Sequence, residues 1–425
     1  MTNTNARYER GSLDWRAKGF PAIEAAMSAG QVREAGWNLF DGRFMLPTMI
    51  IREAALEHDI ALLAAFAERR GVSLAPHGKT TMSPQIWKRQ IDAGAWAITV
   101  ATAWQARVAA SVGIGRILIA NEVVDTAGVA WLGSMLDEAG TVVICQVDSV
   151  AAVERLAGLL GSRRRQMQVL IEVGLRGGRT GLRSLDEAEA VVRAVVGSEA
   201  LLAAGATSFE RIAAGDSDEA KSRAVSDLAG MVRAVGEMVA RDAASNGADE
   251  LILSGGGSIY SPLVAEELSR PLRSDLPVRV VIRAGCTVTH DHGGYDRSSP
   301  WGSHASGDGP RLKPALEVWA PVVSIPEPGL AIAGAGRRDL PYDLGLPTVL
   351  KVRPSDGPSR AATGITVTSL DDQHAYLAVG PGDEVSVGDT IGFGVAHPCS
   401  AFDRWRFIPV VDEAYDIIDV YETLF

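Results

Sequence analysis

The stretch VSLAPHGKT, residues 72–80, decides how the rest of the chain is interpreted. It has the pattern of a short apolar strand that ends in small residues and is followed by a lysine just before a helix. Enzymes built on a parallel barrel keep their reactive groups at the carboxyl ends of the strands. Lys79 is therefore a candidate Schiff-base lysine, although a lone lysine at such a place is more often a surface charge.

Outward from this stretch, short apolar runs alternate with helical patterns. The predicted strands mostly lack polar alternation, as strands buried on both faces do; they span residues 72–76, 96–101, 116–120, 141–147, 168–173, 201–206, 250–253 and 279–282. The predicted helices span residues 52–70, 83–93, 104–112, 126–138, 150–160, 184–196, 218–245 and 262–269. This alternation predicts an α/β fold with a (β/α)8 TIM barrel. A doubly wound open sheet is the alternative, because counting strands does not prove closure, and the run at 201–206 could also be the tail of a helix.

After about residue 310 the alternation stops, and the chain becomes rich in Pro, Gly and Val with short strand signals. This composition favours a smaller β domain. We therefore expect an N-terminal segment over residues 1–45, a barrel over 46–305 and a C-terminal β domain over 306–425. Trp15, Trp37 and Phe40 are expected to anchor the N-terminal segment on the body. The loop 290–311 is polar and Gly-rich and is interpreted as a linker or a lid.

The bulk composition excludes several classes of protein. A formal net charge of −11 lacks the basic footprint of a nucleic-acid binder. No apolar run approaches the ~18 residues of a membrane span, and the first residues have no signal-peptide core. The cysteines, Cys145, Cys286 and Cys399, are few and odd in number. We therefore expect a cytoplasmic protein without a disulfide framework, and no nucleic-acid or membrane partner.

A glycine run supplies a candidate phosphate site. The Gly-Lys-Thr at residues 78–80 is not a phosphate loop, because Ser73 stands where that motif needs glycine. After a predicted strand come Ser254, Gly255, Gly256, Gly257 and Ser258. Successive backbone N–H groups without side chains in the way can surround a phosphate, although such a run can equally be a flexible turn. With a cofactor-bearing lysine on the same rim, the phosphate of that cofactor is the economical interpretation.

Two further features invite ligands. Arg179 follows a Gly-Gly pair at the end of a predicted strand, where a guanidinium can hold an anion or contact a cofactor ring. His397 and Cys399 are two residues apart, and in an extended segment such side chains share one face and can share a metal. An isolated pair is more often an ordinary buried cysteine beside a histidine. A rival metal cluster, or else a solvated lid, is formed by His290, Asp291, His292, Tyr295 and Asp296.

Several motifs occur in an order that is similar to a known family: PHGKT at 76–80, GRTG at 178–181, SGGGS at 254–258, RAGC at 283–286, AGRRD at 335–339 and HPC at 397–399. Together they resemble the D-serine dehydratase-like branch of the fold-type III pyridoxal-phosphate enzymes. D-Threonine aldolases and 3-hydroxyaspartate dehydratases are near relatives, and alanine racemase is a distant one. The resemblance covers about residues 45 to 410, and HGKT with the late H-x-C are its most specific parts.

The resemblance implies an alanine-racemase-like barrel with a C-terminal β domain, in a homodimer. Lys79 would carry pyridoxal 5'-phosphate as a Schiff base and remove the Cα proton of the substrate. The loop Gly255–Ser258 would bind the phosphate, and Arg179 would contact the ring side. His397 and Cys399 would bind Zn2+ or another divalent metal next to the cofactor. The remaining expected cofactor-binding residues are His77, Ser254, Gly285 and Cys286.

The implied activity is dehydration of a D-3-hydroxy amino acid, such as D-serine, to a 2-oxo acid and ammonia. The alternative is retro-aldol cleavage to glycine and an aldehyde, as in D-threonine aldolase. Aldolases of the family tend to carry H-x-D at the metal, so the H-x-C here favours dehydration. A racemase would not need the metal pair, and a pyridoxal-phosphate carrier is typically a single barrel. Thr287 stands where relatives often have an aromatic residue, and the N-terminal segment and loop 290–311 exceed the family pattern.

Overall fold

The computed structural model describes residues 10–138, 140–210, 216–243, 247–305 and 308–425. The chain divides into two compact units. The barrel unit contains residues 63–79 and 87–285. The β unit contains residues 9–62, 80–86 and 286–425. Among the described residues, no helix is both long enough and apolar enough to cross a membrane.

The barrel unit is built on eight parallel strands: β2 (Ser73–Leu74), β3 (Ile98–Val100), β4 (Arg116–Glu122), β5 (Val142–Val147), β6 (Met167–Val173), β7 (Leu201–Ser208), β8 (Leu251–Gly255) and β9 (Val278–Ile282). They pair in the order β2-β9-β8-β7-β6-β5-β4-β3. The two ends of this sheet meet, because the backbone N–H of Trp96 donates to Leu74 O at 2.7 Å and that of Thr99 donates to Pro76 O at 2.9 Å. The closed sheet confirms the predicted barrel, and the run 201–206 is a strand rather than the tail of a helix.

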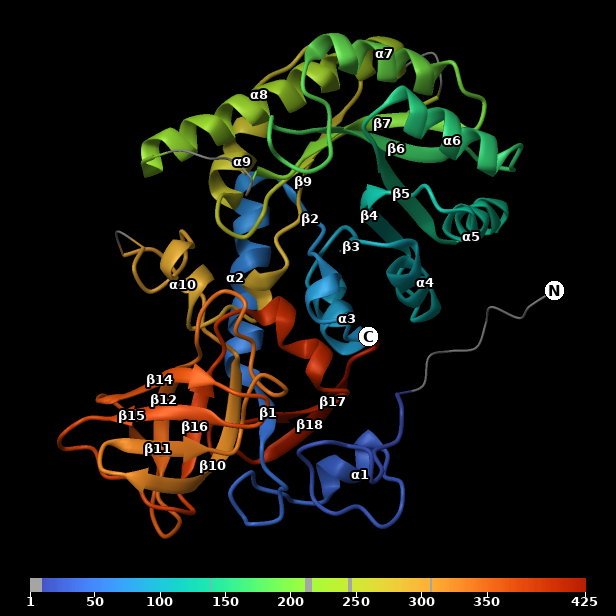
Figure 1. Ribbon diagram of the computed structural model, residues 1–425. Helices are drawn as coiled ribbons and strands as arrows, with labels where there is room; N and C mark the ends of the chain where they lie inside the picture. The colour runs from blue at the N-terminus through green and yellow to red at the C-terminus, as the bar shows by residue number, and fades with distance from the viewer. Residues whose placement is uncertain (1–9, 139, 211–215, 244–246, 306–307) are drawn as a thin grey trace. The chain divides into compact units, whose positions relative to one another are not determined.

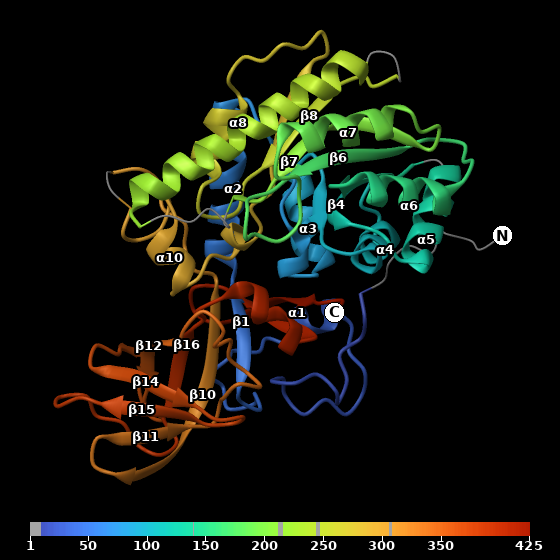
Figure 2. The same cartoon turned by 45° about the horizontal axis from the view of Figure 1, so that its top comes forward.

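Helices alternate with these strands: α2 (Glu53–Arg70), α3 (Pro84–Asp92), α4 (Ala103–Ser111), α5 (Thr126–Asp137), α6 (Val150–Leu160), α7 (Leu185–Val196), α8 (Asp218–Ala243) and α9 (Ser261–Leu268). Figures 1 and 2 show α4 to α8 on the outer side of the strands of this unit. Four of these helices have an N-cap residue whose side chain accepts the backbone N–H three residues later. This hydrogen bond satisfies one of the donors that the first helical turn leaves unpaired. The N-cap residues are Thr102, Asp125, Ser149 and Ser184.

Inside the barrel, one side chain from each strand or its immediate flank forms an apolar layer: Ala75, Ala97, Leu118, Ile144, Leu170, Ala204, Ile252 and Val281. Every member is at most 4% exposed. Inward-facing side chains fill a closed barrel of this size, so its centre is a packed core rather than a pore. This layer is the floor beneath the carboxyl ends of the strands.

The β unit contains a ten-stranded sheet: β1 (Thr48–Arg52), β10 (Leu316–Glu327), β11 (Leu330–Ala333), β12 (Thr348–Arg353), β13 (Arg360–Ala361), β14 (Ile365–Leu370), β15 (Ala375–Val379), β16 (Thr390–Gly394), β17 (Phe407–Val411) and β18 (Ile417–Glu422). Strand β1 lies between β10, to which it is antiparallel, and β17, to which it is parallel. The short helices α1 (Ala29–Glu34) and α10 (Gly294–Ser298) also belong to this unit.

The units divide the chain at other positions than the expected boundaries at 45/46 and 305/306. Residues 46–62 join the β unit because β1 completes its sheet, and a local strand pattern does not say which sheet a strand will enter. In the N-terminal segment, Trp37 and Phe40 pack in a core with Trp319 and Phe407, as expected of anchors. Trp15 is 82% exposed, so the expectation that it anchors the segment is wrong.

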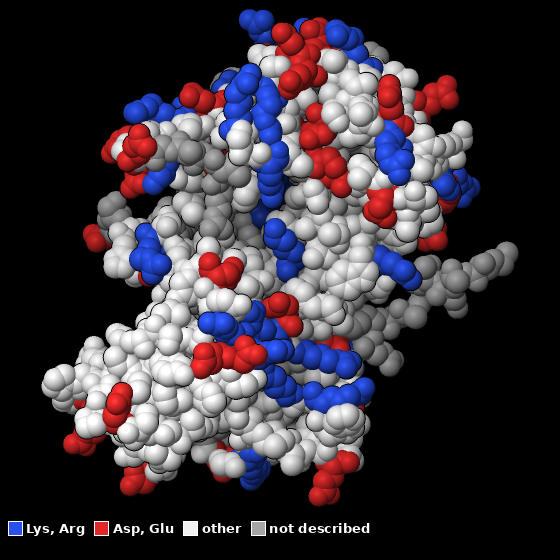
Figure 3. All heavy atoms as spheres, viewed as in Figure 1, with Lys and Arg blue, Asp and Glu red and all other residues white. Residues whose placement is uncertain are grey.

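The face drawn in Figure 3 carries both acidic and basic side chains, and the basic ones gather most closely across the lower middle of the view. The formal net charge of the whole chain is −11.

Candidate active site

The inner face of the barrel becomes polar immediately above its apolar layer. Successive inward residues of a strand are two positions apart. Two positions beyond members of the apolar layer lie six polar residues: His77, Thr99, Gln146, Glu172, Ser254 and Arg283. All except the half-buried His77 are at most 5% exposed. A buried polar layer at the carboxyl ends of the strands is the arrangement expected of an active-site floor.

His77 lies within reach of three cations. Burial, and then the positive charges of Lys79, Arg283 and Arg179, hold the pKa of His77 well below its ordinary value. The imidazole is therefore neutral, and its buried Nδ1 has no hydrogen-bond partner among the described residues. The structure thus brings together the predicted residues His77, Lys79 and Arg179.

Lys79 lies in a single 3-10 turn, Gly78–Thr80, directly after His77. Its side chain is half-buried and makes no hydrogen bond or ion pair with any described residue. Gly78 is required beside it, because a Cβ there would come within 2.6 Å of Trp87 Nε1, which donates to Gly78 O at 3.2 Å. This packing fixes the backbone that presents Lys79 and leaves the amine available to a carbonyl ligand.

Two carboxyl groups form a pair above β4 and β6. Neither oxygen of Glu122 nor Oε2 of Glu172 has a hydrogen-bond partner among the described residues. Burial, and then the charge of Glu172, raise the pKa of Glu122 to about 8. Glu122 therefore keeps its proton at neutral pH. Because these three oxygens have no partner among the described residues, the pair can serve a ligand in the barrel mouth.

The predicted phosphate loop does bind an anion, but that anion is a side chain of the protein. The backbone N–H groups of Gly256 and Gly257 both donate to the carboxylate of Glu210, the first at 3.0 Å. Glu210 is 1% exposed. Gly256 has φ +97°, and a Cβ there would come within 2.8 Å of Ile282 Cγ2, so the turn requires glycine. The loop is thus an anion-binding nest, and a carboxylate occupies it.

Arg283 stabilises the same region from β9. Its guanidinium donates to Ser254 Oγ at 2.6 Å, to Ser208 O at 2.7 Å and to Thr207 Oγ1 at 2.5 Å. Burial lowers its pKa to about 10, but it remains charged. These three acceptors are neutral, so no direct contact cancels the positive charge of Arg283. That charge favours an anion nearby, and in this structure the anion is Glu210.

Arg179 is held at the rim rather than in the floor. Its guanidinium lies 4.3 Å from the centre of the Phe209 ring, and its side chain is 48% exposed. Its Nη2 is 3.9 Å from Glu172 Oε1. Arg183 shapes this loop by donating to Thr180 O at 2.9 Å and to Arg179 O at 2.6 Å. Arg179 is therefore placed to meet a ligand, whereas Arg183 is structural.

A second cluster lies in the β unit. Ligand atoms of Cys286, His397 and Cys399 all lie within 4.8 Å of one another. The two Sγ atoms are 3.0 Å apart. His397 Nδ1 is 2.6 Å from Asp343 Oδ2, and Ser400 Oγ donates to the other oxygen of Asp343 at 2.5 Å. A carboxylate behind a histidine fixes the ring and leaves Nε2 free to bind a metal.

The rival cluster at residues 290–296 is structural. Asp291 is buried and accepts the backbone N–H groups of Gly293, Tyr295 and Asp296 at 2.9 to 3.2 Å. His290 Nε2 is 3.1 Å from Asp296 Oδ1. Burial lowers the pKa of His292 to about 4. Asp291 therefore caps the start of α10, and the segment is an ordered structure rather than a solvated lid.

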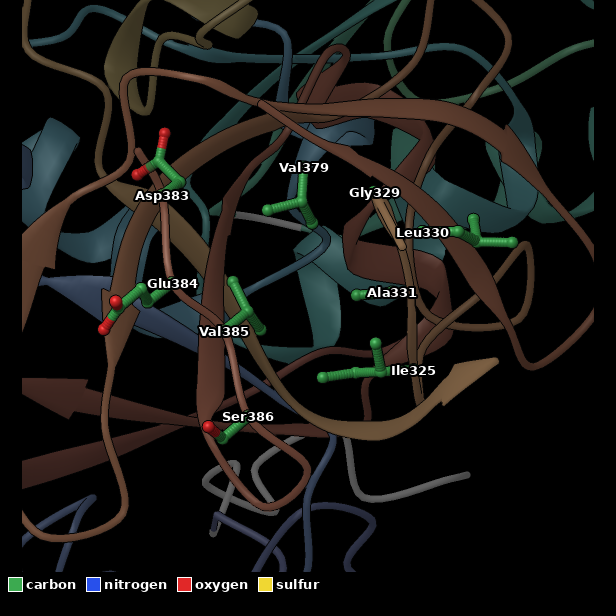
Figure 4. Close-up of a pocket in the computed structure, with 9 residues that line it drawn as sticks. All are labelled: Ile325, Gly329, Leu330, Ala331, Val379, Asp383, Glu384, Val385 and Ser386. Carbon is green, nitrogen blue, oxygen red and sulfur yellow. The ribbon is translucent and has the colours of Figure 1, made fainter. Parts of the chain in front are cut away.

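Two other hollows contain none of the predicted residues. One, of about 350 Å3 in the β unit, is lined by Ile325, Val379 and Val385, with Asp383 and Glu384 at its edge (Figure 4). Asp383 there pairs with Arg360 at 3.0 Å. The other, of about 310 Å3, lies at the amino ends of the barrel strands beside Trp96 and Arg116. Catalytic groups of barrels lie at the opposite ends of the strands, so the second hollow is not a candidate site.

Sequence reasoning missed Glu122, Glu172, Glu210 and Asp343 as site residues. Glu122 and Glu172 did carry a signal, because each is an acid at the end of an otherwise apolar buried strand. Glu210 and Asp343 come from irregular segments with no periodic pattern. Cys286 was expected on the cofactor side, and the structure places its thiol among the possible metal ligands.

Comparison with known proteins finds sequences that are similar to this chain. The family model described as a putative serine dehydratase domain matches residues 315–411. D-Threonine aldolase from Arthrobacter sp is 26% identical over 381 residues, which is 88% of this chain and 91% of that protein. 3-Hydroxy-D-aspartate aldolase from Paracoccus denitrificans is 23% identical over 317 residues, which is 73% of this chain and 76% of that protein.

Solved structures share the fold. D-Threonine aldolase from Filomicrobium marinum has a TM-score of 0.74 at 23% identity and covers 90% of this chain and 95% of its own. D-threo-3-hydroxyaspartate dehydratase from Delftia sp. HT23 has a TM-score of 0.66 at 22% identity and covers 89% and 97%. Alanine racemase from E. faecalis has a TM-score of 0.59 at 18% identity and covers 86% and 98%.

The fold and these matches define an alanine-racemase-like barrel joined to a β domain, the architecture of the fold-type III pyridoxal-phosphate enzymes. Within that class its relatives belong to the D-serine dehydratase-like branch, which confirms the resemblance seen in the sequence. The prediction that this chain is an enzyme, a pyridoxal-phosphate-dependent lyase, is confirmed with it.

The residues present fit both groups that this family implies. For pyridoxal phosphate, the barrel offers an unpaired lysine, a nest whose N–H groups already bind carboxylate oxygens, and buried polar atoms without partners. For a divalent metal, the β unit offers two thiols and an imidazole backed by a carboxylate. The individual site residues remain predictions, and the following two variants test the least expected of them.

Glu210→Gln is expected to bind pyridoxal phosphate more tightly than the wild type. The amide keeps the shape of the side chain but removes the charge that competes with phosphate for Gly256 and Gly257. Loss of charge-assisted hydrogen bonds predicts roughly tenfold tighter binding in titrations of cofactor-free protein. Pyridoxal, which lacks the phosphate, is the control and should bind both proteins equally. Weaker binding of pyridoxal phosphate by the variant would show that Glu210 supports the phosphate instead of competing with it.

Glu122→Gln is expected to stabilise the cofactor-free protein at high pH. The folded protein holds a proton on Glu122 up to pH about 8, whereas the ordinary pKa of a glutamate side chain is 4.5. The unfolded chain releases that proton earlier, so stability falls as pH rises from about 4.5 to 8. The variant should therefore raise the melting temperature by roughly 2–5 °C at pH 8.5 and by less at pH 5. Glu154→Gln, at an exposed position on α6, is the matched control, and an equal effect of both variants would contradict the assignment.

Proposed function

We propose that this chain is a pyridoxal-phosphate- and metal-dependent dehydratase that converts a D-3-hydroxy amino acid, such as D-serine, into a 2-oxo acid and ammonia. The observation that carries the proposal is the cluster of two thiols and an imidazole within 4.8 Å. A hydroxide ion is a poor leaving group, and a metal at these ligands would stabilise its departure. The elimination therefore has a group for each of its two difficult events, loss of the Cα proton and loss of the hydroxyl.

The residues of the barrel would perform the first event. Bound pyridoxal phosphate supplies an electron sink for the pair left at Cα. Lys79 Nζ holds the cofactor and, once free, accepts the Cα proton of the substrate. Neutral His77 and protonated Glu122 face this region without adding charge, and Arg179 at the rim can orient an anionic group of the ligand.

The residues of the β unit would perform the second event. His397 and Cys399 hold the metal, and Asp343 orients the imidazole through Nδ1 at 2.6 Å. The hydroxyl of Thr80 lies 3.1 Å from Cys399 Sγ.

Retro-aldol cleavage is the second candidate, because a D-threonine aldolase is matched over 88% of this chain. That reaction needs a base for the proton of the 3-hydroxyl, and a metal on the same oxygen would also favour it. The two reactions break different bonds, Cβ–O in dehydration and Cα–Cβ in cleavage. The products therefore distinguish them.

Product analysis is the decisive experiment. Protein loaded with pyridoxal phosphate and zinc is incubated with D-serine, D-threonine and D-threo-3-hydroxyaspartate in turn. Dehydration is expected, and it yields ammonia and a 2-oxo acid in equal amounts. Glycine with an aldehyde would replace our proposal by the aldolase, and D-to-L conversion alone would replace it by a racemase.

Lys79→Ala is expected to lose both the visible absorption of the Schiff base and at least ~10³-fold in turnover, because the same amine holds the cofactor and moves the proton. Chelation of the metal should instead abolish turnover and leave the absorption intact. Arg183→Lys, which changes a residue that only shapes the loop, is the comparison. Survival of the absorption band in Lys79→Ala would overturn the central assignment.

A further inference from the structure

We propose that Cys286 is a third protein ligand of the metal, so that Cys286, His397 and Cys399 form a Cys2His site with one open position that selects zinc. The sequence motif supplied only the last two, and the resemblance assigned Cys286 to the cofactor side. The inference rests on the proposed function only for the presence of a metal. It concerns which atoms hold that metal and which metal they prefer.

Geometry is the first argument. Cys286 Sγ lies 3.0 Å from Cys399 Sγ, and both thiols lie within 4.8 Å of a nitrogen of His397. Two sulfurs that bind one tetrahedral zinc at about 2.3 Å are roughly 3.7 Å apart. The thiols therefore need to separate by only some tenths of an ångström to admit the ion.

The position of Cys286 is fixed by the backbone rather than by chance packing. It begins a 3-10 turn, Cys286–Val288, directly after Gly285. A Cβ on Gly285 would come within 2.6 Å of His77 O, so the backbone here is tightly held. Cys286 itself is 5% exposed. A buried thiol usually packs against apolar groups, whereas this one faces a second thiol and an imidazole.

The surroundings already orient the other two ligands. Asp343 holds Nδ1 of His397 at 2.6 Å, which directs Nε2 to the metal. The hydroxyl of Thr80 is 3.1 Å from Cys399 Sγ and can donate to a thiolate there. Supporting groups of this kind are a feature of metal sites and are unnecessary for two cysteines that only fill a core.

The donor set decides the metal. Two thiolates and one imidazole suit zinc and are poor ligands for Mg2+, which prefers oxygen. Among the described residues the cluster has three ligands and no fourth. Catalytic zinc sites have three protein ligands and keep the fourth position for water or substrate, so one coordination position would remain for the substrate hydroxyl.

Cobalt substitution tests the ligand count without measuring activity. Full-length protein is stripped of metal under reducing conditions and titrated with Co2+, whose sulfur-to-cobalt absorption reports bound thiolates. Cys286→Ser is expected to lose about half of that absorption and roughly 100-fold or more in Zn2+ affinity. Cys145→Ala is the matched control, because Cys145 lies in β5 and burial raises the pKa of its thiol to about 12. Absorption and affinity equal to wild type in Cys286→Ser would overturn the proposal.

A measurement on the wild type guards against a variant that fails to fold. X-ray absorption of the zinc-loaded protein should count two sulfur neighbours per zinc, and one sulfur would overturn the proposal. A Cys286–Cys399 disulfide that forms in the presence of zinc, detected as a mass lower by two hydrogens, would also count against it. Two sulfurs on zinc in a protein that yields no 2-oxo acid would sink the proposed reaction and leave this inference intact.

Discussion

Closure of the parallel sheet is the constraint on which the candidate site in the barrel depends. Hydrogen bonds from Trp96 and Thr99 hold one end of the sheet against the segment that leads to Lys79. In a closed barrel each strand alternates between inward and outward positions, so an inward apolar residue makes the residue two positions later face inward as well. As a result, His77, Glu172 and Arg283 all lie above one apolar layer, although they are far apart in sequence.

A buried polar layer is costly unless its groups find partners, and the partners here are distributed unevenly. The guanidinium of Arg283 is bonded to three protein oxygens, and the nest of Gly256 and Gly257 is filled by Glu210. Glu122, Gln146 and Nδ1 of His77 have no such partners among the described residues. The satisfied groups lie toward β7–β9 and the unsatisfied ones toward β2 and β4–β6. The second group is therefore the part of the floor that a ligand would complete.

The sequence predicted well what local pattern controls. The strands of the barrel, the lysine after the first of them and the glycine nest all follow from short-range periodicity and composition. It predicted less well what depends on segments that meet only after folding. Glu210 and Asp343 lie in irregular segments, and β1 has an ordinary strand pattern that does not reveal which sheet it joins. The pattern His-Asp-His at 290–292 suggested ligands, yet Asp291 caps a helix. Spacing alone cannot distinguish a ligand from a cap.

The thiol cluster of the β unit is what separates the proposed chemistry from racemisation on the same fold. Racemisation only exchanges the proton on Cα, and an electron sink with a base suffices for it. Elimination must also expel hydroxide, which is a poor leaving group because its conjugate acid, water, is a very weak acid, and a bound metal lowers that barrier by taking the developing charge. Alanine racemase shares the architecture at a TM-score of 0.59 and 18% identity. In our proposal, the possible metal ligands at residues 286, 397 and 399 are therefore the feature of this chain that favours bond cleavage at Cβ.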